Sequence, residues 1–236
     1  MTWSLIARDP ETGAFGIAVA TKNFAVGCRV PHIAAGIGAV ATQALSNPFY
    51  GVNGIKLLRV GKSASDVVKT LTGADAGREH RQLHVMDAAG RTAAHTGKDC
   101  IDWCGSTAGE GFSVAGNMLA GPAVIQETAK AYVANSALPF PRRLIAALKA
   151  GEAAGGDKRG KQSAALVIYG EEEWPDLDLR VDDHTDPLAE LSRLEAVRRE
   201  RWVHFSKLLP NKRDPVGIID RAELDARIAS ALAGAK

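Results

Sequence analysis

The feature that most constrains the fold is a pair of strand-like segments at the start of the chain, joined by a tight turn. Residues 3–8 (WSLIAR) and 15–21 (FGIAVAT) are rich in apolar and β-branched side chains, which is typical of strands. Residues 9–13 (DPETG) lie between them, and there proline presets φ while glycine permits positive φ. The pattern predicts an N-terminal hairpin, and with it an antiparallel sheet.

The rest of the chain alternates between groups of strand-like and helix-like segments. Ser63 and Asp66 match a capping box, and Asp186 with Pro187 matches an N-cap followed by proline. This order is not a regular βαβ alternation, so it predicts an α+β fold with helices outside antiparallel sheets. Further strands are predicted at 37–43, 81–87, 91–95, 112–115, 163–169 and 177–181, and helices at 54–60, 64–71, 123–134, 141–152, 187 to about 209, and 222–233.

Length and composition place the chain among globular proteins. Its 236 residues predict one domain over 1–209 and a short helical tail over 210–236. The formal charge of +2 gives no general attraction to nucleic acid or anionic lipid, and no apolar run approaches the roughly 20 residues that span a bilayer. The first residues lack a signal-peptide pattern. We therefore expect a cytoplasmic protein without nucleic-acid or membrane partners.

Three motifs suggest cofactor sites but fail on context. Residues 155–161 fit the start of a phosphate loop, yet Gln162 follows them, and the predicted helix precedes the loop instead of following it. In a strand, His80 and His84 would lie about 13 Å apart, too far to share an ion. Cys100 and Cys104 lack a second pair at zinc spacing. The sequence thus predicts no metal and no other cofactor.

Thr2 is the strongest candidate for chemistry, because removal of Met1 would make it the mature N-terminus. A hydroxyl and a free α-amine would then share one residue, and an α-amine has an ordinary pKa of about 7.7–8.0. Such an amine can act as general base for its own hydroxyl. Threonine at position two also occurs in proteins without any catalytic role. The strand that follows at once would hold the hydroxyl rigidly at a sheet edge.

Most of the chain resembles a known family. The matching segments run from Thr2 to about Leu194 and include TWSLIARDPETGAFGIAVATK, IGAVATQALSNPFYG, GREHRQLHVMDAAGRTAAHTG, GFSVAGNMLAGP, GEAAGGDKRGKQSAAL and DLRVDDHTDPLAELSRL. They resemble the DUF1028 family of bacterial and archaeal proteins, which is placed by fold in the N-terminal-nucleophile (Ntn) hydrolase superfamily. The resemblance implies a four-layer αββα sandwich, in which two antiparallel sheets lie between helical layers.

The resemblance also implies catalytic roles. Ntn hydrolases attack a carbonyl, usually of an amide, through an acyl-enzyme, which places nucleophile and base on Thr2. Donors for the developing oxyanion are then required, and the candidates are Asn117, Thr42 and Gln43. Lys22 is expected either to lower the pKa of the amine or bind a carboxylate, or to be a solvated strand end.

Four further residues are candidates for substrate binding, namely Arg81, Asp157, Arg159 and Gln162. The last three lie in one predicted loop, which they would otherwise hold together by charge-assisted hydrogen bonds. A positively charged pocket formed by Lys22, Arg81 or Arg159 would favour a substrate that carries a carboxylate.

Several functions stay open at the level of sequence. The first is an amidohydrolase acting on a small-molecule amide, and the second is a non-catalytic ligand-binding or structural protein on the same scaffold. A peptidase is a third. The predicted C-terminal helix carries an apolar stripe that would pack either on the core or on a second subunit, as a homodimer; the stripe consists of Leu188, Leu191, Leu194 and Trp202.

Overall fold

The computed structural model describes residues 2–234, which form two compact units that divide between Leu191 and Ser192. The sequence predicted a boundary after residue 209 instead. The observed boundary lies inside helix α5 (Pro187–Glu200), where Leu188 and Leu191 are fully buried. The helical sequence pattern continues past Leu191, so the pattern alone does not reveal this boundary.

The larger sheet of the first unit is antiparallel throughout, in the order β10-β9-β2-β1-β8-β7. The predicted hairpin forms its centre, because β1 pairs with β2 on one side and with β8 on the other. The strands are β1 (Thr2–Arg8), β2 (Phe15–Thr21), β7 (Gly105–Gly109), β8 (Phe112–Asn117), β9 (Ser163–Tyr169) and β10 (Leu177–Val181).

The smaller sheet is also antiparallel, in the order β3-β4-β5-β6. Its strands are β3 (Pro31–Ala34), β4 (Gly38–Ala44), β5 (Arg81–Asp87) and β6 (Thr92–Thr96). The sequence did not predict β3 or β7. Both are short edge strands, one opening with proline and the other rich in glycine, and these residues obscure a strand pattern.

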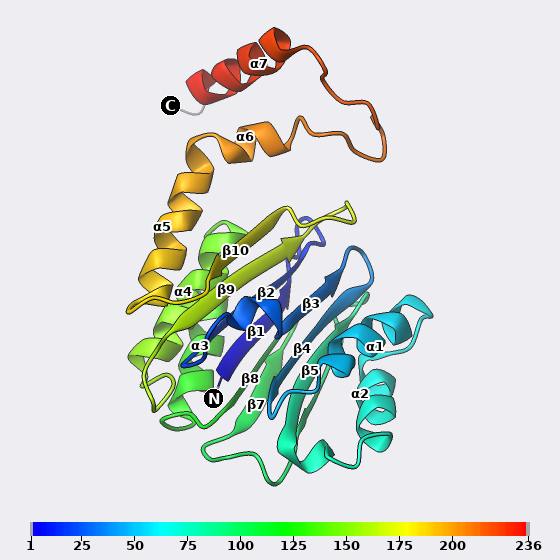
Figure 1. Cartoon of the computed structure of the whole chain (residues 1–236), viewed down its shortest axis with the longest axis vertical. Helices are drawn as coiled ribbons and strands as arrows, with labels where there is room; N and C mark the ends of the chain where they lie inside the picture. The colour runs from blue at the N-terminus through cyan, green and yellow to red at the C-terminus, as the bar shows by residue number, and fades with distance from the viewer. Residues whose placement is uncertain (1, 235–236) are drawn as a thin grey trace. The chain divides into compact units, whose positions relative to one another are not determined.

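Helices cover the outer face of each sheet (Figure 1). Helices α1 (Pro48–Arg59) and α2 (Ala64–Gly73) pack on the smaller sheet, and α3 (Ala123–Ala134) and α4 (Phe140–Ala153) on the larger. Two short 3₁₀ helices, η1 (Val26–Cys28) and η2 (Arg78–His80), precede strands. The two sheets face each other. The fold is therefore the predicted four-layer αββα sandwich.

The helix starts follow local chemistry. Ser63 accepts a hydrogen bond from the backbone N–H of Asp66 at 3.1 Å and donates to its carboxylate at 2.7 Å, which confirms the predicted capping box. Asn47 caps α1, and Pro48 is its first residue, so this helix begins six residues before the predicted Gly54. Asp186 Oδ1 accepts from the N–H of Ala189 at the start of α5.

Two clusters of the apolar core lie on either side of the smaller sheet. Between the sheets lie Ile6, Phe15, Ile17, Val19 and Met86 with their neighbours. A second cluster, which includes Val40, Tyr50, Val67 and Leu83, lies between the smaller sheet and its helices. Both follow from the period-two alternation of side chains along β4 and β5, which sends successive residues to opposite faces.

The second unit holds the remaining helices, α6 (Trp202–Ser206) and α7 (Arg221–Gly234). A single helix was predicted from residue 187 to about 209, and this is wrong, because Arg201 adopts a non-helical backbone conformation between α5 and α6. Arg201 pairs with Asp225 of α7 at 2.9 Å. Of the predicted apolar stripe, Leu188 and Leu191 are buried, whereas Trp202 is 45% exposed. Packing on a second subunit stays a prediction.

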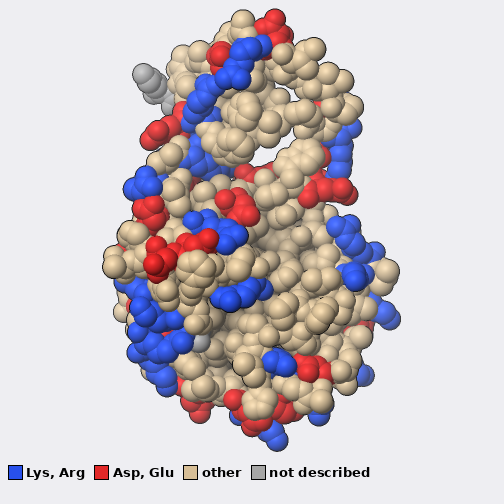
Figure 2. Space-filling model, viewed as in Figure 1, with Lys and Arg blue, Asp and Glu red and all other residues tan. Residues whose placement is uncertain are grey.

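No helix within residues 2–234 combines the length and apolar character that crossing a membrane requires. Figure 2 shows basic and acidic side chains interspersed over one face of the first unit.

Candidate active site

Thr2 occupies the end of the central strand, between two neighbouring strand ends. In the sheet register it lies opposite Thr21 of β2 and Asn117 of β8, and the residue is only 6% exposed. Ser4 contacts residues of the smaller sheet, so Thr2, two positions earlier, points into the same space between the sheets. Its Oγ1 donates a hydrogen bond to Thr21 Oγ1 at 3.1 Å.

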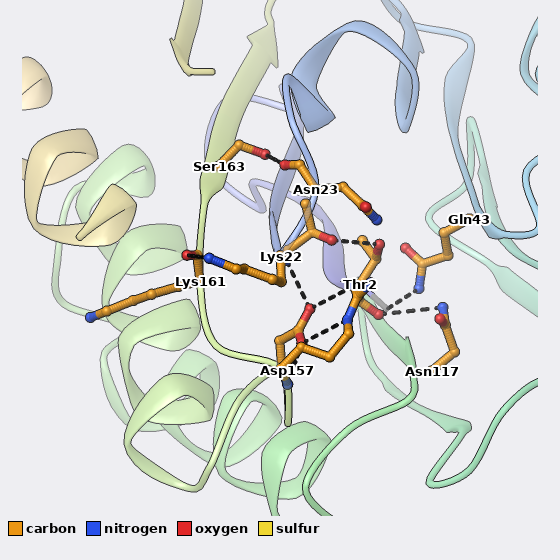
Figure 3. A network of polar contacts seen from close by, with 10 residues as sticks. Thr2, Lys22, Asn23, Gln43, Asn117, Asp157, Lys161 and Ser163 are labelled. Carbon is orange, nitrogen blue, oxygen red and sulfur yellow. Dashed lines mark hydrogen bonds and ion pairs between the residues drawn. The ribbon is translucent and has the colours of Figure 1, made fainter. Parts of the chain in front are cut away.

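The loop between α4 and β9 closes one side of this position. Asp157 forms an isolated bridge with Leu119, just beyond β8, and its Oδ2 accepts from the backbone N–H of Lys22 at 2.8 Å. The backbone N–H of Gln162 donates to Thr21 O at 3.0 Å. Asp157 therefore joins the ends of β2 and β8 around Thr2 (Figure 3).

Each of the three predicted cations is engaged with another group of the chain. Lys22 extends away from Thr2 and donates from Nζ to Lys161 O at 3.2 Å (Figure 3). Arg159 pairs with the buried carboxylate of Asp157 at 3.1 Å, and Arg81 with Asp75 at 3.2 Å. The structure therefore does not bring Lys22, Arg81 and Arg159 into one pocket.

The predicted oxyanion donors differ in their availability. Gln43 donates from Nε2 to Gln82 Oε1 at 2.8 Å and to Ala115 O at 3.1 Å, with a longer contact of 3.4 Å to Thr2 O. Asn117 donates to Gln82 Oε1 at 3.0 Å and reaches Thr2 O at 3.5 Å. Both amides thus lie beside Thr2, and the second hydrogen of Asn117 makes the weaker contact.

Two other predicted residues lie apart from this group. Thr42 faces the helices that cover the smaller sheet, because it precedes Gln43 in the same strand; it donates to Asn47 O at 3.3 Å. The side chain of Gln162 donates to Asp183 at 3.1 Å. Neither side chain is brought to Thr2.

A buried polar network continues from Gln43 along the space between the sheets. Ser4 donates to Gln43 Oε1 at 2.7 Å, so its oxygen accepts from His84 Nε2 at 2.8 Å. His84 Nδ1 then accepts from the hydroxyl of Ser113 at 3.0 Å. Complete burial lowers the pKa of His84 to about 3, which agrees with the neutral ring that this arrangement of protons requires.

Gln82 is the junction of this network. Its Oε1 accepts from both Gln43 and Asn117, while its Nε2 donates to Gly116 O at 2.8 Å and to Thr96 Oγ1 at 2.9 Å. Sequence reasoning did not find Gln82, His84, Ser4, Ser113 or Thr21. The available signal was polar residues at alternate positions of an otherwise apolar strand, as in Gln82 and His84.

A cavity of about 270 Å³ opens beside Asn117. Its lining includes Leu45 and Ile101, which are 64% and 57% exposed. Ala44 and Met118 also line it, with φ of 70° and 59°. Positive φ is uncommon for residues other than glycine, and such strained positions cluster at functional sites. Ala44 is the last residue of β4, which carries Gln43, and Met118 directly follows Asn117 at the end of β8.

The nearby thiols are poor candidates for a nucleophile. Burial raises the pKa of Cys100, which lines the same cavity. Burial, together with the carboxylate of Asp102, raises the pKa of Cys104 to about 11. Both are therefore protonated near neutral pH, and the thiolate is the reactive form. Within residues 2–234 no cluster of three or more His, Cys, Asp and Glu side chains is arranged to hold a metal ion.

Comparison with known proteins gives the family of the chain. The model of a family of unknown function, DUF1028, matches residues 2–191. The chain belongs to the DUF1028 family. A crystal structure of the DUF1028 protein SPO2555 from Silicibacter pomeroyi is similar to it, with 36% identity and a TM-score of 0.86 over 93% of this chain and 99% of that one.

A more distant structure is Anbu (ancestral beta-subunit) from Yersinia bercovieri, with 12% identity and a TM-score of 0.40 over 89% of this DUF1028 chain and 98% of that one. No curated protein matches the chain.

Proposed function

We propose that this DUF1028 protein is an N-terminal-nucleophile hydrolase that cleaves an amide C–N bond of a small molecule through Thr2. The observation that carries the proposal is the position of the Thr2 side chain. It lies at the end of the central strand, points between the sheets, and contacts Thr21 Oγ1 at 3.1 Å. The cavity beside Asn117, with its two strained residues, supports the same location.

The proposed reaction begins when removal of Met1, which lies outside the described residues, frees the α-amine of Thr2. The amine takes the proton of Oγ1, and the oxygen attacks the substrate carbonyl. The C–N bond then breaks, the leaving amine takes the proton from the α-ammonium, and an ester remains on Thr2. Water, deprotonated by the same amine, hydrolyses the ester, releases the acid and restores the hydroxyl.

The surrounding residues have defined roles in this scheme. Thr21 holds Thr2 Oγ1 in place, and the proton of Thr2 Oγ1 rotates from Thr21 Oγ1 toward the α-amine. The weakly held hydrogen of Asn117 is the candidate donor for the oxyanion, while Gln43 and Gln82 orient that amide. Asp157 positions the ends of β2 and β8, since it binds the backbone of Lys22 and forms a bridge with Leu119.

The test starts with the intact mass of the purified protein, where we expect loss of Met1. A panel of small N-acyl amides is then assayed for release of the amine. Thr2→Ala should lower turnover by at least about 10³-fold, and Thr2→Ser should retain part of it. Thr70→Ala, an exposed threonine of α2, is the matched control. Retention of Met1 in most molecules, or full activity in Thr2→Ala, would contradict the proposal.

A second candidate is a ligand-binding protein without catalysis. Two contacts favour this candidate: Lys22 donates to Lys161 O, and Gln43 donates to Gln82 and Ala115. Neither side chain is then available to assist a reaction. Loss of Met1 without turnover of any amide, combined with saturable binding of an amide, would favour this candidate.

A further inference from the structure

A second cavity lies at the opposite end of the sandwich from Thr2. It has a volume of about 660 Å³ and is independent of the chemistry proposed for Thr2. Strand β1 runs from Thr2 to Arg8, which separates its two ends by about 20 Å at ~3.3 Å per residue. Residues of the β1–β2, β5–β6 and β7–β8 turns frame the cavity, together with side chains of α3 and α4.

Arg8 is held between two of these turns. A methyl group placed on Gly13 would come within 3.2 Å of Arg8 Nη2, and one on Gly90 within 3.7 Å of its Cδ. Both glycines have positive φ, 75° and 78°, so the turns exclude other residues for conformational reasons too. The arginine is therefore fixed by turns whose glycines leave room for it.

The charge of Arg8 has no counterion among residues 2–234. Its Nε is shielded from solvent and has no hydrogen-bond acceptor, and no carboxylate within residues 2–234 forms an ion pair with its guanidinium. A desolvated donor without an acceptor costs free energy. An acceptor from outside residues 2–234 would therefore stabilise this position.

Arg143 of α4 adds a second such charge. Its Nε donates to Tyr132 O at 2.7 Å, and its guanidinium carbon lies 3.7 Å from the centroid of the Tyr132 ring. These contacts fix the plane of the guanidinium while they use only one of its nitrogens. The terminal amino groups keep the geometry that binds carboxylate and phosphate oxygens in pairs.

The other charged residues of the lining leave it positive. Arg91 pairs with Asp87 at 2.9 Å, and Asp87 also accepts from the backbone N–H groups of Ala64 and Ala89. Glu110 is exposed and is the single acid among the residues that line the cavity. Because Asp87 balances Arg91, the charges of Arg8 and Arg143 face one exposed carboxylate around this space.

We propose that this cavity binds a small oxyanion-bearing molecule, with its phosphate or carboxylate group held by Arg8 and Arg143. The volume of about 660 Å³ exceeds what a bare ion fills, so it leaves room for an anionic group carried by a larger organic molecule. Tyr132 and the glycine backbones provide its uncharged walls.

The full chain, labelled with ¹⁵N, is titrated separately with inorganic phosphate and with succinate at constant ionic strength, with chloride as the blank. We expect saturable shifts of the amide signals of Gly90 and Gly111. Saturation by phosphate alone identifies a phosphate ester as the ligand class, and saturation by succinate alone identifies a carboxylate; either supports the proposal.

Variants separate a site from a general salt effect. Arg8→Gln and Arg143→Gln should each weaken binding by about tenfold or more, as expected for loss of a charged hydrogen bond. Arg142→Gln, the exposed neighbour in α4, should leave it unchanged. Glu110→Gln, at an exposed turn and so without effect on folding, should tighten binding. Non-saturable shifts in the wild type, or equal affinity in Arg143→Gln and Arg142→Gln, would overturn the proposal.

Discussion

The space between the two sheets has an apolar half and a polar half. Away from Thr2, its side chains are apolar and include Ile6, Phe15, Ile17 and Met86. Next to Thr2, the same layer is filled by hydrogen-bonded polar side chains, which are Ser4, Gln43, Gln82, His84, Ser113 and Asn117. All of these residues are buried, so exposure to water does not account for the difference.

The comparison shows two ways of holding sheets together. Apolar contacts stabilise through the area they remove from water, and they tolerate small shifts between the sheets. The polar half is directional, because a shift would leave buried donors and acceptors unpaired, at a cost of about 1–3 kcal/mol each. We infer that the apolar half supplies most of the stability and that the polar half orients Asn117 and Thr2.

The largest expected loss of stability comes from the apolar half. Ile17→Ala should lower the free energy of unfolding by about 4 kcal/mol, since the side chain is fully buried and a cavity would remain. Urea unfolding measures this change. Val60→Ala, at a position 74% exposed, should alter stability by less than about 0.5 kcal/mol. A loss below about 1 kcal/mol in Ile17→Ala would contradict the inference that the apolar half supplies most of the stability.

Gln82→Leu is the corresponding change in the polar half. It removes the acceptor of both Gln43 and Asn117, so we expect a loss of about 3 kcal/mol. Unlike Ile17→Ala, it should also reduce amide cleavage in the Thr2 assay, because Asn117 loses its orientation. Gln126→Leu, on the exposed face of α3, is the matched control. Unchanged activity in Gln82→Leu would mean that the network does not orient the site.

The pH dependence of stability tests the neutral state of His84. Its folded pKa of about 3 lies below the ordinary value of 6.5. Above pH 6.5 the ring is neutral in both states. Between pH 6.5 and 3 only the unfolded state binds the proton, so the free energy of unfolding should fall by about 1.4 kcal/mol per pH unit as pH decreases.

This slope is measured by urea unfolding at pH 7, 6, 5 and 4. His84→Asn should lack this contribution, so the difference in unfolding free energy between this variant and the wild type should change with pH, whereas for His80→Gln, at a side chain 52% exposed, the difference should stay constant. An unchanged slope in His84→Asn would show that another group dominates.

The smallest effect is expected for Ser113→Ala. It removes the donor to His84 Nδ1 and should cost about 1 kcal/mol, measured in the same unfolding experiment. Ser106→Ala, on the exposed side of the neighbouring strand β7, should have no measurable effect. Equal unfolding free energies for the two variants would show that the hydrogen bond from Ser113 to His84 does not stabilise the protein.

Elements with a strong local pattern were predictable from the sequence. The strands Phe15–Thr21, Ser163–Tyr169 and Leu177–Val181 and the helix Ala123–Ala134 have the predicted bounds. Those that were missed or misplaced depend on the tertiary context. Pro31–Ala34 becomes a strand because β4 pairs with it, and α5 ends at Glu200 although its helical pattern continues.

The candidate site was predictable only in part. Asn117 and Gln43 lie beside Thr2, and Asp157 contacts the adjacent end of β2. Thr42 was misjudged because one residue along a strand reverses the face. Arg81 was a candidate for substrate binding, yet it forms an ion pair with Asp75. The pairing of charges depends on neighbours far apart in the sequence, and composition does not reveal it.

The sequence by itself determined the antiparallel hairpin at the start of the chain, the location of most strands and helices, and Thr2 as the residue at the head of the first strand. These follow from turn residues and side-chain periodicity, which act between near neighbours in the chain. Only the tertiary structure decided that Gln43, Gln82 and Asn117 surround Thr2 and that Arg8 and Arg143 share a cavity at the other end. Sheet order and register set these contacts, because they bring together residues that lie dozens of positions apart.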